Sequence, residues 1–195
     1  MQKLSSLAVL ACFFFLNACH SSETVKPANT TVDSTNIFPV TSFLRAQLKE
    51  LDTLPVTPLL IVSKNNKKDS TWLKREDIRK YAIPFLSPEI DSANMQNLFR
   101  ESSFLDQSIN SYTFSYDPKS NIPDSIHLNH WDVYMNPENN LVTRIYLVKE
   151  NDSAGESVTR QLTWLVDKWF SIRTISQKQG QKPEIKEEKM IWNFD

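Results

Sequence analysis

The sequence predicts an α+β protein in which N-terminal helices pack on a curved antiparallel β-meander, half-barrel-like or cone-like in shape. Apolar residues early in the folded region recur with the helical period, whereas from Ser111 onward they alternate with the period of two that is typical of strands. Several strands carry large apolar side chains on both faces. Because a flat sheet wetted on one side would not do this, we expect helices to cover one face and the sheet to curl or be covered on the other.

Three helices and a hairpin are expected in the first part of the folded region. Pro39 suits the first turn of a helix, whose apolar residues then follow the 3.6-residue period as far as Leu51. The next predicted elements are a hairpin of Leu59–Ser63 with Thr71–Leu73, a second helix over Lys74–Ala82 and a third helix over Asp91–Leu105. Pro84 ends the second helix, and Asp91 suits the N-cap of the third.

Six strands are expected after Ser111, joined by short turns. The predicted strands are Tyr112–Tyr116, Ile126–Met135, Leu141–Lys149, Val158–Val166, Trp169–Ile175 and Glu187–Phe194. Asp167 and Lys168 are interpreted as a two-residue hairpin connection. The run Lys186–Lys189 (KEEK) is interpreted as a solvated strand edge whose charges discourage pairing with another strand.

The N-terminus has the features of an export signal that ends in a lipobox. Lys3 precedes the apolar run Leu4–Leu16, which is shorter than the ~20 residues that span a bilayer. The run ends in Leu-Asn-Ala-Cys, where small residues favour cleavage before Cys19. This pattern resembles the signal peptides of bacterial lipoproteins. We therefore expect a signal peptide over residues 1–18, a flexible tether over 19–37 and a single α+β domain over 38–195.

The resemblance to bacterial lipoproteins implies a diacylglycerol on the Cys19 sulfur, and hence lasting attachment to a membrane. His20 stands where an Asp would signal retention at the inner membrane in some bacteria, so the resemblance implies the outer membrane, facing the periplasm. The tether is rich in Ser, Thr and Asn and cannot bury a core. Since Cys12 leaves with the signal and Cys19 is acylated, no thiol remains for a disulfide or a metal site.

Composition argues against several classes of function. The chain of 195 residues has 22 basic and 23 acidic residues, a formal charge of −1, so it has no electrostatic footprint for nucleic acid. It contains only two glycines, and no Rossmann or P-loop fingerprint can be assembled. We therefore expect no cofactor, no metal and no nucleic-acid partner, and we do not expect an enzyme.

Few residues could carry catalysis. His127 and His130, the histidines of the domain, lie three apart on a predicted strand and should point to opposite faces, so they cannot share a metal ion. His130 and Asp132 can face the same way, but two ligands do not make a zinc site. Ser102 and Ser103 lack the setting of a nucleophile elbow. Structural histidines are the simpler interpretation, whereas a cleft joining His130, Asp132 and a third polar group would indicate an enzyme.

The aromatic residues of the predicted strands form the more informative set. Trp131, Tyr146, Trp164 and Trp192 are candidates for ligand binding. Two interpretations stay open for them. They form the ordinary core of the sheet, since aromatic residues favour strands, or they line an apolar pocket inside a curved sheet closed by the helices.

The predicted layout is similar to two known groups, the half-barrel lipoprotein carriers and the cone-shaped nuclear-transport-factor-2-like fold. The likeness concerns architecture alone, so it assigns no site residue. Our first hypothesis is a non-catalytic, lipid-anchored lipoprotein of the cell envelope that binds an apolar ligand or an envelope protein. The alternatives are a structural or assembly subunit of an envelope complex and, less favoured, a small hydrolase.

Overall fold

The structure is a computed structural model that describes residues 37–65, 67–120, 122–153 and 155–195. The predicted signal peptide, Cys19 and the tether as far as residue 36 lie outside the described residues. Ile37, the last residue assigned to the tether, is described and is buried in the core.

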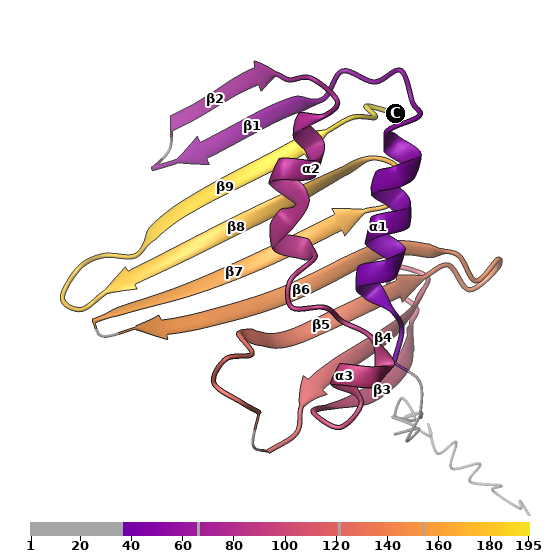
Figure 1. Cartoon of the computed structure of the whole chain (residues 1–195), viewed down its shortest axis with the longest axis vertical. Coiled ribbons are helices and arrows are strands. Elements are labelled where there is room, and N and C mark those ends of the chain that lie inside the picture. The colour runs from indigo at the N-terminus through magenta and orange to yellow at the C-terminus, as the bar shows by residue number, and fades with distance from the viewer. Residues whose placement is uncertain (1–36, 66, 121, 154) are drawn as a thin grey trace, which may run out of the picture.

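The predicted α+β class is wrong, because one nine-stranded antiparallel sheet dominates the fold (Figure 1). Strands make up 49% of the structure and helices only 15%, so the protein is all-β-like. The strand order is β2-β1-β9-β8-β7-β6-β5-β4-β3. The N-terminal hairpin therefore extends the same sheet beside β9. The predicted architecture was a half-barrel-like or cone-like meander covered by helices. The structure instead has a large open sheet with few short helices.

Most predicted strands coincide with observed ones. The strands are β1 (Leu59–Lys64), β2 (Lys67–Trp72), β3 (Phe99–Asp106), β4 (Ser111–Pro118), β5 (Leu128–Met135), β6 (Val142–Ser153), β7 (Glu156–Leu165), β8 (Trp169–Lys178) and β9 (Glu184–Ile191). The helices are α1 (Val40–Leu51), α2 (Asp77–Ala82), the 3₁₀ turn η1 (Ile83–Phe85) and α3 (Ser92–Met95). The connection between β7 and β8 has three residues, Val166–Lys168, and not the predicted two, because Leu165 is the last residue to pair and lies opposite Trp169. Asp167 adopts the left-handed region there, at φ 63°.

The third predicted helix is mostly strand. Asp91 does cap a helix: its carboxylate accepts a hydrogen bond from the Asn94 N–H at 3.1 Å, and the Asn94 side chain accepts one from the Asp91 N–H at 3.2 Å. The helix ends at Met95, however, and Phe99–Asp106 forms β3, which pairs with β4 along its whole length. Cross-strand pairing therefore outweighs the weak helical period of this segment.

The run Lys186–Lys189 does not lie at a sheet edge. It belongs to β9, which pairs with β8 on one side and with β1 on the other. Alternation along the strand distributes its charges over two faces. Lys186 forms an ion pair with Glu188 at 2.9 Å on one face, and Lys189 lies over the Trp169 ring on the other. The strands at the edges of the sheet are β2 and β3.

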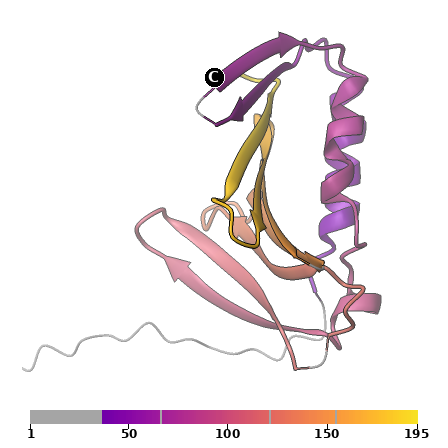
Figure 2. The same ribbon diagram turned by 90° about the vertical axis from the view of Figure 1, so that its left-hand side faces the viewer.

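Helices α1 and α2 lie against one face of the sheet, and the two edges of the sheet project away from them (Figure 2). The core lies between these helices and the sheet. Phe85 of η1 contacts Trp164 at 5.4 Å and Phe170 at 5.3 Å between ring centroids, and Trp164 contacts Trp192 at 5.6 Å. All four rings are at most 5% exposed. This aromatic cluster joins η1 to the sheet.

We expect Trp164→Ala to lower the free energy of unfolding by about 3–5 kcal/mol, because it leaves a cavity inside the aromatic cluster. The matched control is Trp72→Ala in edge strand β2, where the side chain is 61% exposed. The control should cost less than about 1 kcal/mol. Urea denaturation of both variants measures the difference, and equal losses would contradict this account of the core.

Candidate functional site

The sheet register assigns each strand side chain to one of two faces. Directly opposite residues of an antiparallel pair point to the same face, and successive residues of a strand point to opposite faces. One row of opposite residues runs from Asp132 through Tyr146, Thr163 and Ser171 to Lys189. It lies on the face away from α1 and α2. We call this face the open face, because no described helix covers it (Figure 2).

Three of the four aromatic residues predicted to bind a ligand lie in the core, on the face that the helices cover. Trp131 stacks on Tyr116 with 4.6 Å between ring centroids and contacts Phe99 edge-on at 4.5 Å. Trp164 and Trp192 belong to the aromatic cluster described above. The indole N–H groups of all three tryptophans are buried and have no hydrogen-bond partner among the described residues. Their surroundings are those of a packed apolar core.

Tyr146 is separated from the three tryptophans and lies half-buried on the open face. Two ring–cation contacts share this face. Arg144 Cζ lies 3.8 Å from the centroid of the Tyr134 ring, and Lys189 Nζ lies 4.0 Å from that of Trp169. Such contacts contribute about 0.5–2 kcal/mol and hold ring and cation together. Alternation along one strand predicts that Arg144 and Tyr146 share a face, because they lie two residues apart. The contact of Lys189 with Trp169 could not be predicted in this way, since it depends on which strands pair.

A charged network around His130 lies on the open face of β4 and β5. His130 Nδ1 donates to Asp117 Oδ1 at 2.8 Å, and Nε2 donates to Asp132 Oδ1 at 3.0 Å. Ser115 Oγ and the Tyr134 hydroxyl donate to Asp132 at 2.6 Å and 3.1 Å. The expectation that His130 and Asp132 can share a face is confirmed. The contributions of β4 were missed, because they depend on the pairing of two strands.

The two carboxylates determine the charge of His130. The hydrogen bond to Asp132 raises the pKa of His130 most, burial opposes it and Asp117 adds to it, so that the pKa rises to about 9. Burial acts to raise the pKa of Asp132. Hydrogen bonds from His130, Ser115 and Tyr134 outweigh this effect and hold that pKa below its usual value. At neutral pH the network therefore contains an imidazolium between two carboxylates.

This network does not arrange its groups for general-base catalysis. A general base needs a free lone pair near neutral pH, whereas both nitrogens of His130 donate hydrogen bonds. Ser115 donates to Asp132 and not to His130, so the group that accepts its proton is a carboxylate of lowered pKa, a weaker base than a neutral imidazole. The two carboxylates bind opposite nitrogens of the ring, and no three His, Cys, Asp or Glu of the described residues could together hold a metal ion. The network fits a structural role, joining β4 to β5.

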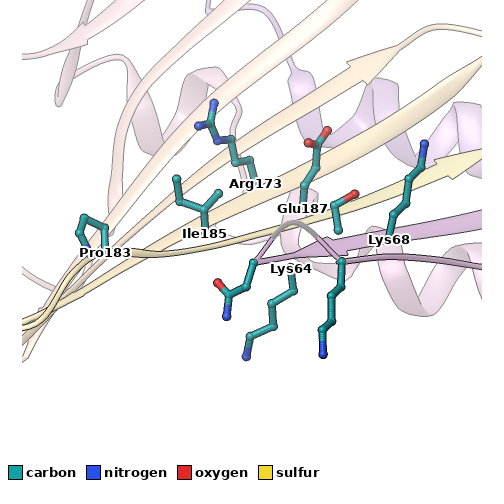
Figure 3. A pocket seen from close by; sticks show the side chains of 9 residues that line it. Lys64, Lys68, Arg173, Pro183, Ile185 and Glu187 are labelled. Atoms are coloured by element: carbon teal, nitrogen blue, oxygen red, sulfur yellow. The ribbon is translucent and has the colours of Figure 1, made fainter.

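A groove of about 650 Å³ lies between the β1–β2 turn and the β8–β9 turn. Figure 3 shows that the side chains of Arg173, Ile185 and Glu187 point to the same side as Lys68, whereas Lys64 points to the opposite side. Arg173 and Glu187 belong to the open face by register. The lining is mostly polar and charged, so the groove extends the open face and does not suit an apolar ligand.

A smaller cavity of about 380 Å³ lies beside η1, and Lys149 of β6 contributes to its lining. Lys149 Nζ donates to the carbonyl oxygens of Pro84 and Ser87. Burial, together with the nearby charge of Arg160, lowers the pKa of Lys149 to about 8. Carbonyls near the end of a helix lack intrahelical partners and attract cations. Lys149 therefore links the segment after α2 to the sheet.

Cys19, the predicted lipidation site, lies outside the described residues. The longest described helix, α1, has 12 residues, well below the ~20 that a bilayer crossing requires. In the part of the chain that the structure describes, no helix combines the length and apolar character of a membrane span. Attachment to a membrane through acylated Cys19 stays a prediction.

We expect the His130 network to stabilise the fold most below pH 6.5 and above the acid range in which Asp132 takes up a proton. Because the folded-state pKa of His130 is raised to about 9 from 6.5, its contribution is complete below pH 6.5 and is lost as the pH rises through 9. His130→Gln should therefore lower the free energy of unfolding by on the order of 2 kcal/mol at pH 6, allowing for solvent screening at Asp117. The difference from the unsubstituted protein should shrink by pH 9.5.

Urea denaturation at both pH values measures this dependence. His127→Gln is the matched control, because His127 is exposed and lies outside the network. A loss of stability in His130→Gln that is the same at pH 6 and pH 9.5 would contradict the assignment of an imidazolium between two carboxylates.

The chain was compared with protein-family models, with curated proteins and with solved structures. No family model matches the sequence, and neither a curated protein nor a solved structure is significantly similar to it.

Proposed function

We propose that this protein is a non-catalytic lipoprotein of the bacterial cell envelope that binds an envelope protein with its open face. Acylated Cys19 would hold the domain at the outer membrane, facing the periplasm. The proposal joins two separate arguments. The lipobox resemblance supports the anchor, and the residues of the open face support the binding of a protein.

The composition of the open face is the observation that carries this proposal. Binding energy in protein interfaces concentrates in Trp, Tyr and Arg residues. The open face presents Trp169, Tyr146 and Tyr134, all half-buried, together with Arg144 and Arg173. They project from hydrogen-bonded strands, and two of the rings are held by cations. A rigid surface of this kind loses little conformational entropy when a partner binds.

A protein partner is favoured over an apolar ligand. Binding of an apolar ligand requires a cavity lined by apolar and aromatic side chains. Trp131, Trp164 and Trp192 were the best candidates for such a lining, but each is at most 5% exposed and packs against neighbouring rings. The groove beside the β1–β2 turn is instead lined by charged residues such as Lys68 and Arg173. A mixture of aromatic, polar and charged groups is typical of non-obligate protein interfaces.

Site-specific photo-crosslinking in the bacterial envelope tests the binding face. A photoreactive residue at Thr163, in the central row of the open face, should give a crosslink to one protein species. The same residue at Ala46, which is exposed on α1, is the control and should not give this product. Adding Tyr146→Ala to the Thr163 variant should reduce the crosslinked fraction roughly tenfold, because an interfacial aromatic anchor is removed. Identical products from Thr163 and Ala46 would overturn the proposed binding face.

A labelling experiment tests the anchor separately. Cys19→Ser removes the predicted acylation site, so the variant should fail to incorporate radiolabelled palmitate and should remain uncleaved or become soluble. Fractionation of the envelope and the size of the product report the two effects. Cys12→Ser is the control, because Cys12 lies within the predicted signal and its loss should leave labelling unchanged. Equal labelling of Cys19→Ser and the unsubstituted protein would rule out the anchor.

A further inference from the structure

We propose that two copies of this chain pair through their β3 strands, antiparallel and about a two-fold axis at Ser103, so that two sheets join into one. Among the described residues, β4 is the neighbour of β3 on one side and no strand lies on the other. The β3–β4 register continues without a shift from Phe99 to Asp106. An edge strand of this regularity is a template for a further strand.

The pairing of β3 with β4 determines which backbone groups of β3 point outward. The Lys119 N–H donates to the Leu98 carbonyl at 2.7 Å, and this pair continues the β3–β4 register by one residue. Hydrogen-bonded and non-hydrogen-bonded pairs alternate in an antiparallel ladder. The backbone groups of Arg100, Ser102, Phe104 and Asp106 therefore point toward β4. Those of the intervening residues point away from it, and these must pair with one another in any antiparallel β3–β3 contact.

One of the permitted registers is also complementary in charge. When Ser103 lies opposite Ser103 of the second copy, Arg100 of each copy lies opposite Asp106 of the other. Both side chains are then on the open-face side of the joined sheet. They occupy non-hydrogen-bonded pairs, in which opposite side chains approach closest. Neither residue forms an ion pair with a described residue. Exposed ion pairs contribute little affinity, but they select one register over others.

The positions of lysine residues also distinguish β3 from the opposite edge. Phe104 and Leu105 are 37% and 43% exposed, and a second strand along β3 would cover part of both. Edge strand β2 also exposes an apolar residue, Trp72, but it carries Lys67 and Lys68 as well, whereas β3 has no lysine. Lysine on an edge is a common protection against unwanted strand pairing. The two edges of the sheet therefore differ, and β3 is the one suited to a partner.

The proposed axis allows both copies to be anchored in one membrane, a step that rests on the proposed lipid anchor. The Phe38 N–H donates to the Tyr116 hydroxyl at 3.4 Å, and Tyr116 lies opposite Glu101 of β3. The chain therefore enters the domain close to the β3 edge, on the helix-covered face. A two-fold axis perpendicular to the sheet keeps Ile37 of both copies on the same side. The two open faces then adjoin on the other side.

Disulfide formation in the full chain, expressed in a bacterial envelope, tests the register. Ser103→Cys should give a symmetric disulfide dimer, because hydrogen-bonded opposite residues have Cα atoms about 5.5 Å apart. Ser102→Cys is the matched control: residues 102 of the two copies would be about 8 Å apart, too far for a disulfide. The unsubstituted chain should give no disulfide-linked dimer, because it has no cysteine in β3. Peptide mass spectrometry identifies the linked residues.

A second experiment tests the pair of Arg100 with Asp106 without introducing a cysteine. Light scattering over a dilution series measures the mass of the detergent-extracted chain. Arg100→Glu should weaken dimerisation by roughly tenfold, because it places two acidic residues opposite each other. Adding Asp106→Arg should restore it to within about threefold, since the ion pair is then reversed.

Three results would overturn the proposal. A monomer at every concentration in light scattering would exclude the dimer. Equal disulfide formation by Ser102→Cys and Ser103→Cys would exclude this register. A disulfide between Ser103→Cys and a different protein would show that the edge binds another chain. Crosslinking from Thr163 tests the open face separately, so failure of the dimer and failure of the proposed function are distinguishable.

Discussion

The alternation of side chains along nine paired strands is the constraint on which the rest of this structure depends. A slip of one residue in any pair would move core side chains to the open face and open-face side chains into the core. The register places Trp164 under the helices and Thr163 on the open face from adjacent positions of β7. In the β5–β6 pair it shifts between Leu128 and His130 and again between Tyr134 and Met135. These irregularities bracket the β5 segment that holds the charged network, as β-bulges near specialised sites often do.

Sequence periodicity predicted the individual strands after Ser111 well, because alternation is a local property that each strand carries by itself. Helix α1 and the Asp91 cap were also predictable, since a proline at the start of a helix, here at the N-cap of α1, and a capping side chain act within a few residues. The third helix was wrong because the segment from Phe99 is stabilised by pairing with β4, which no local pattern reveals. The prediction that Lys186–Lys189 lies at a sheet edge was wrong for the same reason, because the sequence does not show which strands pair.

The candidate site was predicted only in part, for related reasons. Alternation indicated that His130 and Asp132 could share a face, but Asp117 and Ser115 reach them from β4, at a distance in sequence that only the register specifies. Among the aromatic residues, a shift of one position along a strand decides whether a side chain points into the core or to the open face. Tyr146 pairs with Thr163, whereas Trp164 pairs with Ile145 and points to the helices. Composition alone could not make this distinction.

The way in which the chain enters the domain has a mechanical consequence. Thr41 Oγ1 accepts a hydrogen bond from the Ile90 N–H at 2.8 Å, which fixes the first turn of α1, and beyond it Leu44 and Leu48 pack apolar side chains against the sheet. Tension applied from the N-terminal side would load these contacts one turn after another, so α1 would peel from the sheet while the strand ladders stayed intact. The core side chains that pack against Leu44 and Leu48 would then be exposed to solvent. The resistance of the domain to pulling is therefore governed by one helix of 12 residues and not by the nine strands beneath it.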